Sequence, residues 1–215
     1  MQRKSSTLIT LSIAEQAYNC ILERISTGIY APGKLLKEVD LSHELGISRT
    51  PIREALQRLV QYGLVEASGR SMRVRIFFPD EVFHLYQVRR VLELEAVRLA
   101  FGKLTADDFA WLDSCDPGPF NDSPDYSLAA QKFDLELHRT IAERSGNPLL
   151  AHKVRKLHDR VQLVCRPTWQ RVVEHREIIA ALKGVYLEGA IQAMARHLDT
   201  ALESQQKNAK ENFKA

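Results

Sequence analysis

Three arginines recur at short intervals in one stretch of this 215-residue chain. The planar guanidinium of arginine can donate two parallel hydrogen bonds, either to O6 and N7 of guanine or to a phosphate. Ser48 and Thr50 flank the first arginine, and their hydroxyls, with the amides of a helix start, suit phosphate oxygens. The stretch therefore offers five candidate DNA contacts, Ser48, Arg49, Thr50, Arg53 and Arg58.

A carboxylate and three imidazoles form a second candidate set. Asp134 and His138 are four residues apart in a helical pattern and would share one helix face. His175 and His197 follow on later predicted helices, at positions that could turn inward. Such groups on facing helices of a bundle can make a transition-metal site. Spacing alone also allows three ordinary histidines, and it favours them, because no compact metal-binding motif is present.

Arg89 and Glu93 are also four residues apart on a predicted helix. This spacing suits a simple ion pair on a helix surface. The remaining histidines lack partners of these kinds, and we expect them on the surface or at helix ends: His43, His84, His152 and His158.

The arginines lie on the second of two short predicted helices. Residues 39–45 predict the first helix, Gly46 follows it, and Pro51 suits the first turn of the next helix. We expect the first helix to enter the core through Val39, Leu41, Leu45 and Ile47. A helix, a glycine turn and an arginine-bearing helix form the layout of a helix-turn-helix, whose second helix enters the major groove of DNA.

An earlier helix and a hairpin complete the predicted first domain, residues 1–77. Ser12 and Glu15 have the spacing of a capping box. The helix that follows is expected to bury one stripe, formed by Ile13, Ala17, Cys20, Ile21 and Ile25. Residues 64–66 and 72–76 predict a β-hairpin. Gly69 would lie at its tip, and Arg70 beside it is a further candidate contact to phosphate or the minor groove. These elements predict a winged helix-turn-helix.

The remainder, residues 78–215, predicts an all-α antiparallel helical bundle. A proline and two acids at positions 79–81 suit a helix start. Helical periodicity continues over residues 133–144, 148–165, 169–182 and 187–202, with no alternating strand pattern. Residues 116–124 contain three prolines and a glycine, so we expect a loop there. The fold class is therefore mainly α.

Charge is unevenly distributed along the chain. Residues 1–78 contain 11 Lys and Arg against 7 Asp and Glu, whereas the remainder contains 19 against 20. A local basic excess is an electrostatic footprint for phosphate. Three scattered cysteines fit reduced thiols better than a disulfide framework. Because no apolar run is long enough to span a bilayer and no signal peptide is recognisable, we expect a soluble, cytoplasmic protein without membrane partners.

Residues 12–76 resemble the DNA-binding domain of GntR-family bacterial transcription regulators, chiefly through the run GISRTPIREAL at positions 46–56. The resemblance implies that four positions contact DNA, namely Ser48, Arg49, Thr50 and Arg53. It also implies that the wing-tip glycine, Gly69, lies in the minor groove. The fatty-acid-responsive member of the family has a contacting arginine where this chain has Val39, which implies a different operator half-site.

The second half is similar to the FCD effector domain, the ligand-sensing half of the FadR subfamily of these regulators. The matching runs are FDLELH at 133–138, GNPL at 146–149, EHREI at 174–178 and AMARHL at 193–198. In the metal-binding branch of that family the corresponding positions ligate one divalent ion, here Asp134, His138, His175 and His197. Zinc, nickel and manganese all suit such ligands. The resemblance also makes Arg89 a candidate for binding the acid group of an effector.

These patterns predict a transcription regulator that is not an enzyme. A small organic acid, bound at or near the metal, would change its affinity for an operator. One recognition helix reads only a short half-site, so we expect a homodimer on a palindromic operator. In one alternative the metal ion itself is the signal. In another the chain is a small metal-dependent hydrolase, since the same ligands could activate water.

Overall fold

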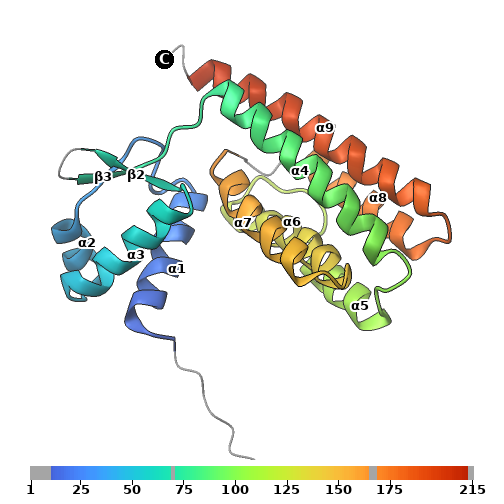
Figure 1. The fold of residues 1–215 in the computed structure, drawn as a ribbon, viewed down its shortest axis with the longest axis horizontal. Helices are drawn as coiled ribbons and strands as arrows, with labels where there is room; N and C mark the ends of the chain where they lie inside the picture. The colour runs from blue at the N-terminus through green and yellow to red at the C-terminus, as the bar shows by residue number, and fades with distance from the viewer. Residues whose placement is uncertain (1–10, 69–70, 165–168, 213–215) are drawn as a thin grey trace, which may run out of the picture. The chain divides into compact units, whose positions relative to one another are not determined.

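The computed structural model describes residues 11–68, 71–164 and 169–212. The chain divides into two compact units, Met1–Ile76 and Phe77–Ala215, and each unit has its own core. Figure 1 shows three helices with a small sheet in the first unit and helices alone in the described part of the second.

The first unit is a winged helix-turn-helix. Its helices and strands are α1 Ile13–Ser26, β1 Leu35–Leu36, α2 Glu38–Leu45, α3 Arg49–Gln61, β2 Val65–Ser68 and β3 Ser71–Val74. Gly46 ends α2 with φ +67°, and no atom lies near enough to crowd a side chain there. Glycine is therefore favoured by the left-handed backbone, not by lack of space. The turn lets α3 bury Ile52, Leu56 and Leu59, as predicted.

Two residues expected in this core lie outside it. Val39 is 58% exposed, because it is two residues from the buried Leu41 and so lies on the opposite side of α2. Ile13 is 56% exposed, since it is the first residue of α1 and lies beyond the buried part of the stripe. The expected capping box is half formed: Oγ of Ser12 accepts from the amide of Glu15 at 3.1 Å, while the Glu15 carboxylate binds Arg58.

The sheet has the order β1-β3-β2, and both pairings are antiparallel. The predicted hairpin is β2 and β3, in register from Val65 opposite Val74 to Ser68 opposite Ser71. Strand β1 was not predicted, because two residues carry no recognisable periodicity. Gly69 and Arg70, the expected wing tip, lie outside the described residues.

The second unit is a bundle of α-helices in its described part. They are α4 Pro79–Ala100, α5 Ala106–Cys115, α6 Pro124–Arg144, α7 Pro148–Val164, α8 Trp169–Lys183 and α9 Leu187–Asn212. Figure 1 shows α4 and α9 side by side, with α6 and α7 packed on the α4 side and α8 against α9. Residues 116–123 form the predicted loop. Helix α5 was not predicted. It begins where Thr105 and Asp108 cap each other's amides.

The bundle core is apolar at its centre. Phe133, Leu137 and Ile141 of α6 are fully buried with Ile178 of α8 and Met194 of α9. Burial of these side chains fixes which face of each helix points inward. Among the described helices none is both long and apolar enough to cross a membrane.

Candidate DNA-binding face and metal centre

The first candidate site is the exposed N-terminal end of α3. Ser48 is the N-cap of α3, and its hydroxyl accepts no capping hydrogen bond from the helix. Arg49, Thr50 and Arg53 follow in the first two turns, and all are exposed. Helix amides with outward hydroxyls and guanidinium groups make a surface suited to phosphates and base edges.

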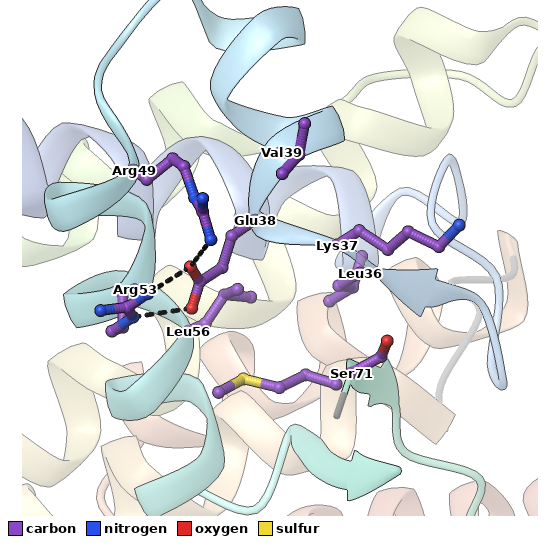
Figure 2. A pocket seen from close by; sticks show the side chains of 9 residues that line it. Leu36, Lys37, Glu38, Val39, Arg49, Arg53, Leu56 and Ser71 are labelled. Atoms are coloured by element: carbon purple, nitrogen blue, oxygen red, sulfur yellow. Dashed lines mark hydrogen bonds and ion pairs between the residues drawn. The ribbon is translucent and has the colours of Figure 1, made fainter. Parts of the chain in front are cut away.

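A carboxylate that the sequence interpretation missed lies against both arginines. Oε1 of Glu38 accepts from Nε of Arg53 at 2.8 Å, and Oε2 accepts from Nη2 of Arg53 at 2.8 Å. The same Oε2 accepts from Nη2 of Arg49 at 3.2 Å. Figure 2 shows the three side chains meeting at the edge of a hollow of about 320 Å³. Hydrogen bonds from Arg53, opposed by partial burial and aided by Arg49, lower the pKa of Glu38.

Arg58, another predicted DNA contact of α3, binds residues of α1 instead. Its guanidinium binds the carboxylate of Glu15 and lies over the ring of Tyr18, with its carbon 4.2 Å from the ring centroid. These contacts hold Arg58 against α1, whereas Arg49 and Arg53 are held by α2. The structure therefore separates Arg58 from the other two arginines. Gly69 and Arg70 fall outside the described residues.

The second candidate site lies inside the bundle. Asp134 and His138 of α6, His175 of α8 and His197 of α9 are all buried, and one possible ligand atom from each lies within 4.8 Å of the others. Nε2 of His175 is 3.2 Å from Oδ1 of Asp134 and 3.3 Å from Nε2 of His197. Nε2 of His138 is 3.8 Å from Oδ1 of Asp134. The structure thus brings together all four residues of the predicted ligand set.

Carboxylates outside the set hold two of the four side chains. Nδ1 of His138 contacts a carboxylate oxygen of Glu93, and Nδ1 of His197 lies 2.9 Å from Oε2 of Glu174. An ionised carboxylate can only accept a hydrogen bond, so Nδ1 of each of these rings is the nitrogen that carries the hydrogen. In a neutral ring Nε2 then has the lone pair, and this atom faces the cluster. Carboxylates that orient histidine in this way are usual around protein-bound metal ions.

His158 of α7 is a fourth buried histidine at this centre. It was expected on the surface, and that expectation is wrong: His158 is 2% exposed, and its Nε2 lies 2.7 Å from Oδ2 of Asp134. A signal for it existed in the sequence, because His158 continues the buried stripe of α7 that contains Leu150, Val154 and Val161.

Burial controls the charge states of the cluster. It lowers the pKa of His138 to about 4, and it lowers the pKa of His197 well below its usual value, helped by nearby His175. Burial opposes ionisation of Asp134, but interactions with His158 and His175 hold its pKa well below the usual range. Neutral imidazoles and an ionised carboxylate are the forms that ligate metal ions.

Arg89 and Glu93 complete the interior polar group. The expectation of a surface ion pair is wrong, since the side chains are only 1% and 4% exposed. Nε of Arg89 donates to Glu93, and Nη2 of Arg89 lies 3.1 Å from Nε2 of His138. Burial opposes the charges of both groups, but their mutual attraction raises the pKa of Arg89 and lowers that of Glu93. Arg89 therefore reaches the cluster directly.

The donor set fits a divalent transition-metal ion. Three imidazole nitrogens and one carboxylate oxygen are ligands that zinc, nickel and manganese accept. Nδ1 of His175 is buried with no hydrogen-bond partner among the described residues. The ring is therefore anchored only through Nε2, the atom that faces Asp134 and His197. A cation bound at Nε2 of His175 would also lie within reach of Oδ1 of Asp134 and Nε2 of His197, which are 3.2 and 3.3 Å from that atom.

Comparisons with known proteins agree with both halves of this architecture. The family model described as "Bacterial regulatory proteins, gntR family" matches residues 13–74, and the FCD domain model matches residues 84–200. The Nta operon transcriptional regulator of Aminobacter aminovorans is 32% identical over 151 residues, which cover 69% of this chain and 71% of that protein. The regulator McbR of Escherichia coli is 28% identical over 203 residues, covering 86% of this chain and 89% of McbR.

A solved structure gives the same result for the fold. The structure of E. coli McbR/YncC superimposes with a TM-score of 0.77 at 24% identity and covers 93% of this chain and 99% of that chain. These relatives are transcriptional regulators and not enzymes, and the same holds for this chain. The chain belongs to the GntR family of bacterial DNA-binding transcription regulators, with an FCD domain following its winged helix-turn-helix.

Proposed function

We propose that α3 enters the major groove of an operator and that Arg49 and Arg53 contact base edges there. Ser48 and Thr50 bind phosphate oxygens, and Gly69 and Arg70 of the wing add contacts to the minor groove or backbone. The exposure of the arginines at the start of α3 supports this assignment. Arg58 is expected to contribute less, because it is held by Glu15 and Tyr18.

A homodimer is part of this proposal. One α3 helix spans only a short half-site, so two copies related by a twofold axis read a palindromic operator, with centres about one helical turn of DNA apart. Regulators of the GntR family usually act as dimers. Size-exclusion chromatography with light scattering, on free chain and on the operator complex, measures the stoichiometry. A single chain per operator would contradict this part.

The second unit is proposed to bind one divalent metal ion through Asp134, His138, His175 and His197. The observation that carries this proposal is the convergence of four buried side chains with possible ligand atoms, of which His138 and His197 are oriented from outside by Glu93 and Glu174. A bound ion would act as a Lewis acid that attracts an anionic group. Elemental analysis of purified protein tests the assignment: one ion per chain is expected, and His175→Ala should lose it while the exposed His152→Ala keeps it.

A small carboxylate is the proposed effector, with Arg89 contacting its acid group. When Nε2 of His138 binds a metal ion, its lone pair no longer accepts from Arg89, and one N–H of the guanidinium requires a new acceptor. An effector carboxylate would provide one. Because Glu93 already balances the charge of Arg89, the metal ion supplies the main attraction for an anion.

Operator binding tests this proposal. An operator is selected from random DNA with full-length chain, and its dissociation constant is measured with metal-loaded protein and a panel of sugar acids, hydroxy acids and aromatic acids. Some carboxylates should change operator affinity by about 5- to 150-fold, the usual range of allosteric coupling. Arg89→Lys, which keeps a positive charge beside Glu93 but loses the guanidinium donors, should weaken that response without changing effector-free binding. A response only to neutral compounds, or an equal response in metal-free protein, would contradict the proposal.

A second candidate keeps the DNA-binding half and makes the metal ion itself the signal. The Arg89–His138 contact favours it, because metal binding at His138 would break a buried link between α4 and α6 without any further ligand. Titration of metal into metal-free protein, in buffer without organic acids, separates the two. A full change in operator affinity with metal alone supports metal sensing, and no change supports acid sensing.

A further inference from the structure

Glu38 is the first residue of α2, and its carboxylate joins two arginines of α3 that the proposed function places on DNA. Three hydrogen bonds link it to Arg49 and Arg53, which are 11 and 15 residues further along the chain. The side chain of Glu38 is only 20% exposed, while those of Arg49 and Arg53 are 58% and 54% exposed. The acid is therefore beneath the guanidinium groups and not above them. Figure 2 shows the Glu38 carboxylate between the guanidinium groups of Arg49 and Arg53.

The pairing with Arg53 uses one particular edge of the guanidinium. Nε and Nη2 both donate to Glu38, each at 2.8 Å. The outer edge of the Arg53 guanidinium consists of one N–H of Nη1 and the second N–H of Nη2. This edge faces away from a carboxylate bound to Nε and Nη2. It presents two parallel N–H groups, which is the arrangement that matches O6 and N7 of guanine.

We infer that Glu38 is a positioning residue for operator recognition, which holds the end-on edge of Arg53, and with it the side chain of Arg49, in the direction of the DNA before DNA is bound. The inference rests on the proposed roles of Arg49 and Arg53. It assigns base discrimination partly to a residue that does not itself contact a base.

Two physical arguments favour a positioning role over an inhibitory role, in which Glu38 would compete with DNA for the arginines. An arginine side chain loses substantial rotamer freedom when it is immobilised at an interface, and a partner that orders it in the free protein reduces that loss on binding. The carboxylate also pairs with two cations, so the three groups together still carry a net positive charge toward phosphate. An inhibitory carboxylate would instead cover the outer Nη1 and Nη2 edge of Arg53, whereas Glu38 binds Nε and one N–H of Nη2.

The hollow beside Glu38 supports the same role. Leu36, Leu56 and Met72 line it together with Glu38, and only 20% of the Glu38 side chain is exposed. Restricted hydration strengthens its hydrogen bonds to the guanidinium groups. The hydrogen bonds from Arg53 and Arg49 keep the carboxylate ionised at any pH used for DNA binding.

The test compares Glu38→Gln with wild type on the selected operator and on random DNA, using the full-length chain. Glutamine keeps the shape but removes the charge and places N–H groups against the arginines. Operator affinity should fall roughly fivefold to tenfold, because two arginines must now be ordered on binding. Affinity for random DNA should rise, because one negative charge is lost. A parallel rise on both DNAs, or no change on either, would overturn the inference.

Glu44→Gln is the matched control. Glu44 is on the same helix and carries the same charge, but its carboxylate binds Arg24 and the hydroxyl of Tyr30. Its loss should change binding to operator and random DNA in parallel. If Glu44→Gln lowers the ratio of the two affinities as much as Glu38→Gln does, the effect of Glu38 is general charge and not positioning.

A double-variant cycle separates this inference from the proposed function. If Arg53→Ala leaves base preference intact, the proposed role of Arg53 fails, whatever Glu38 does. If Arg53→Ala relaxes base preference at one position per half-site, Glu38→Gln should relax the same position, and in the Arg53→Ala background it should have little further effect there. Fully additive effects, with Arg53 retained as a reader, would overturn the positioning role alone.

A measurement without DNA guards against a folding artefact. In the nitrogen-15 spectrum of the free full-length chain, the Nε–H signal of Arg53, assigned by its loss in Arg53→Lys, should exchange slowly with water. Glu38→Gln should accelerate that exchange at least several-fold while the helical circular dichroism stays unchanged. Fast exchange already in wild type would overturn the inference, because the arginine would then not be held in the free protein.

Discussion

Each half of this chain contains an arginine that is bound by a glutamate, and the two pairs differ mainly in burial. Glu38 and Arg53 are 20% and 54% exposed in the winged helix-turn-helix, whereas Glu93 and Arg89 are 4% and 1% exposed in the FCD domain. In the first pair the guanidinium keeps an edge open to solvent, where DNA can approach. In the second pair both groups are enclosed by the bundle.

The comparison separates two uses of the same ion pair. Water screens the exposed pair, so it contributes little to stability and can serve to orient a side chain. The enclosed pair has no such screening, so neither partner can be removed without leaving a buried charge. Stability should therefore depend on Glu93, and recognition of DNA should depend on Glu38.

The largest expected effect is that of Glu93→Gln. Removal of this charge leaves Arg89 buried without a counter-ion and weakens the support of His138, so the free energy of unfolding should fall by about 3–5 kcal/mol. Urea unfolding followed by circular dichroism measures it. Glu38→Gln in the same assay should lose less than about 1 kcal/mol. Similar losses for the two variants would break the comparison, because burial would then not distinguish the pairs.

Metal removal should destabilise the second half strongly. An ion at 100 times its dissociation constant should add about 2.7 kcal/mol to the free energy of unfolding, because it binds only the folded ligand set. Thermal unfolding with and without a chelator measures this difference. His197→Ala should abolish it, and His152→Ala, an exposed histidine of α7, should retain it. A chelator effect that survives in His197→Ala would show that the ligand set is wrong.

Acid should destabilise the metal-free protein through its buried histidines. Burial lowers the pKa of His138 to about 4 in the folded chain, against about 6.5 when unfolded. Between these values the unfolded chain binds the extra proton, so stability present above about pH 6.5 is lost as pH falls. We expect a loss of about 2 kcal/mol by pH 5. Chelator-treated protein, unfolded in urea at several pH values, tests this, and His138→Gln should show a shallower dependence.

Arg53→Ala should cost about 1–3 kcal/mol of specific DNA binding with little change in folding stability. The arginine is exposed and held by one acid, so its loss removes a contact to DNA without opening the core. Fluorescence anisotropy on the operator and on operators changed at single base pairs measures the effect. Equal losses on operator and random DNA would mean that Arg53 contacts only phosphate.

Arg58→Ala sharpens the comparison within the first unit and should have the smallest effect on recognition. Its guanidinium is held by Glu15 and Tyr18, so we expect a stability loss of about 0.5–1 kcal/mol and no change in base preference. The same two assays measure both quantities. A loss of base preference as large as that of Arg53→Ala would show that Arg58 leaves Glu15 to contact DNA.

Much of the fold could be predicted because its signals are local. The glycine at position 46 and the spacing of Ile52, Leu56 and Leu59 define the helix pair within a few turns of chain. The prolines and glycine of residues 116–124 exclude a helix there in the same way. Helix α5 escaped prediction, because a ten-residue helix with only two buried residues, Leu112 and Cys115, has a weak apolar period.

Residue types and spacing offered the four candidate metal ligands as one possible set, but only the family resemblance favoured a metal site over ordinary histidines. Asp134 and His138 share a helix face by their spacing, but nothing local indicates that His175 and His197 lie opposite them. The packing of α6, α8 and α9 brings the four together. His158 was misplaced because its position on an apolar stripe was outweighed by the usual exposure of histidine.

The sequence by itself determined every described helix except α5, the helix-turn-helix layout and the residue types able to contact DNA or a metal ion. The helices and the turn between α2 and α3 follow from a period or a cap within a few residues. The tertiary structure alone decided which polar groups meet across separate helices. Glu38 reaches Arg53 across 15 residues, His158 reaches Asp134 across 24, and Glu93 reaches His138 across 45. Such pairings depend on how separate helices pack, and burial then decides whether a given pair supports the fold or remains open to a ligand.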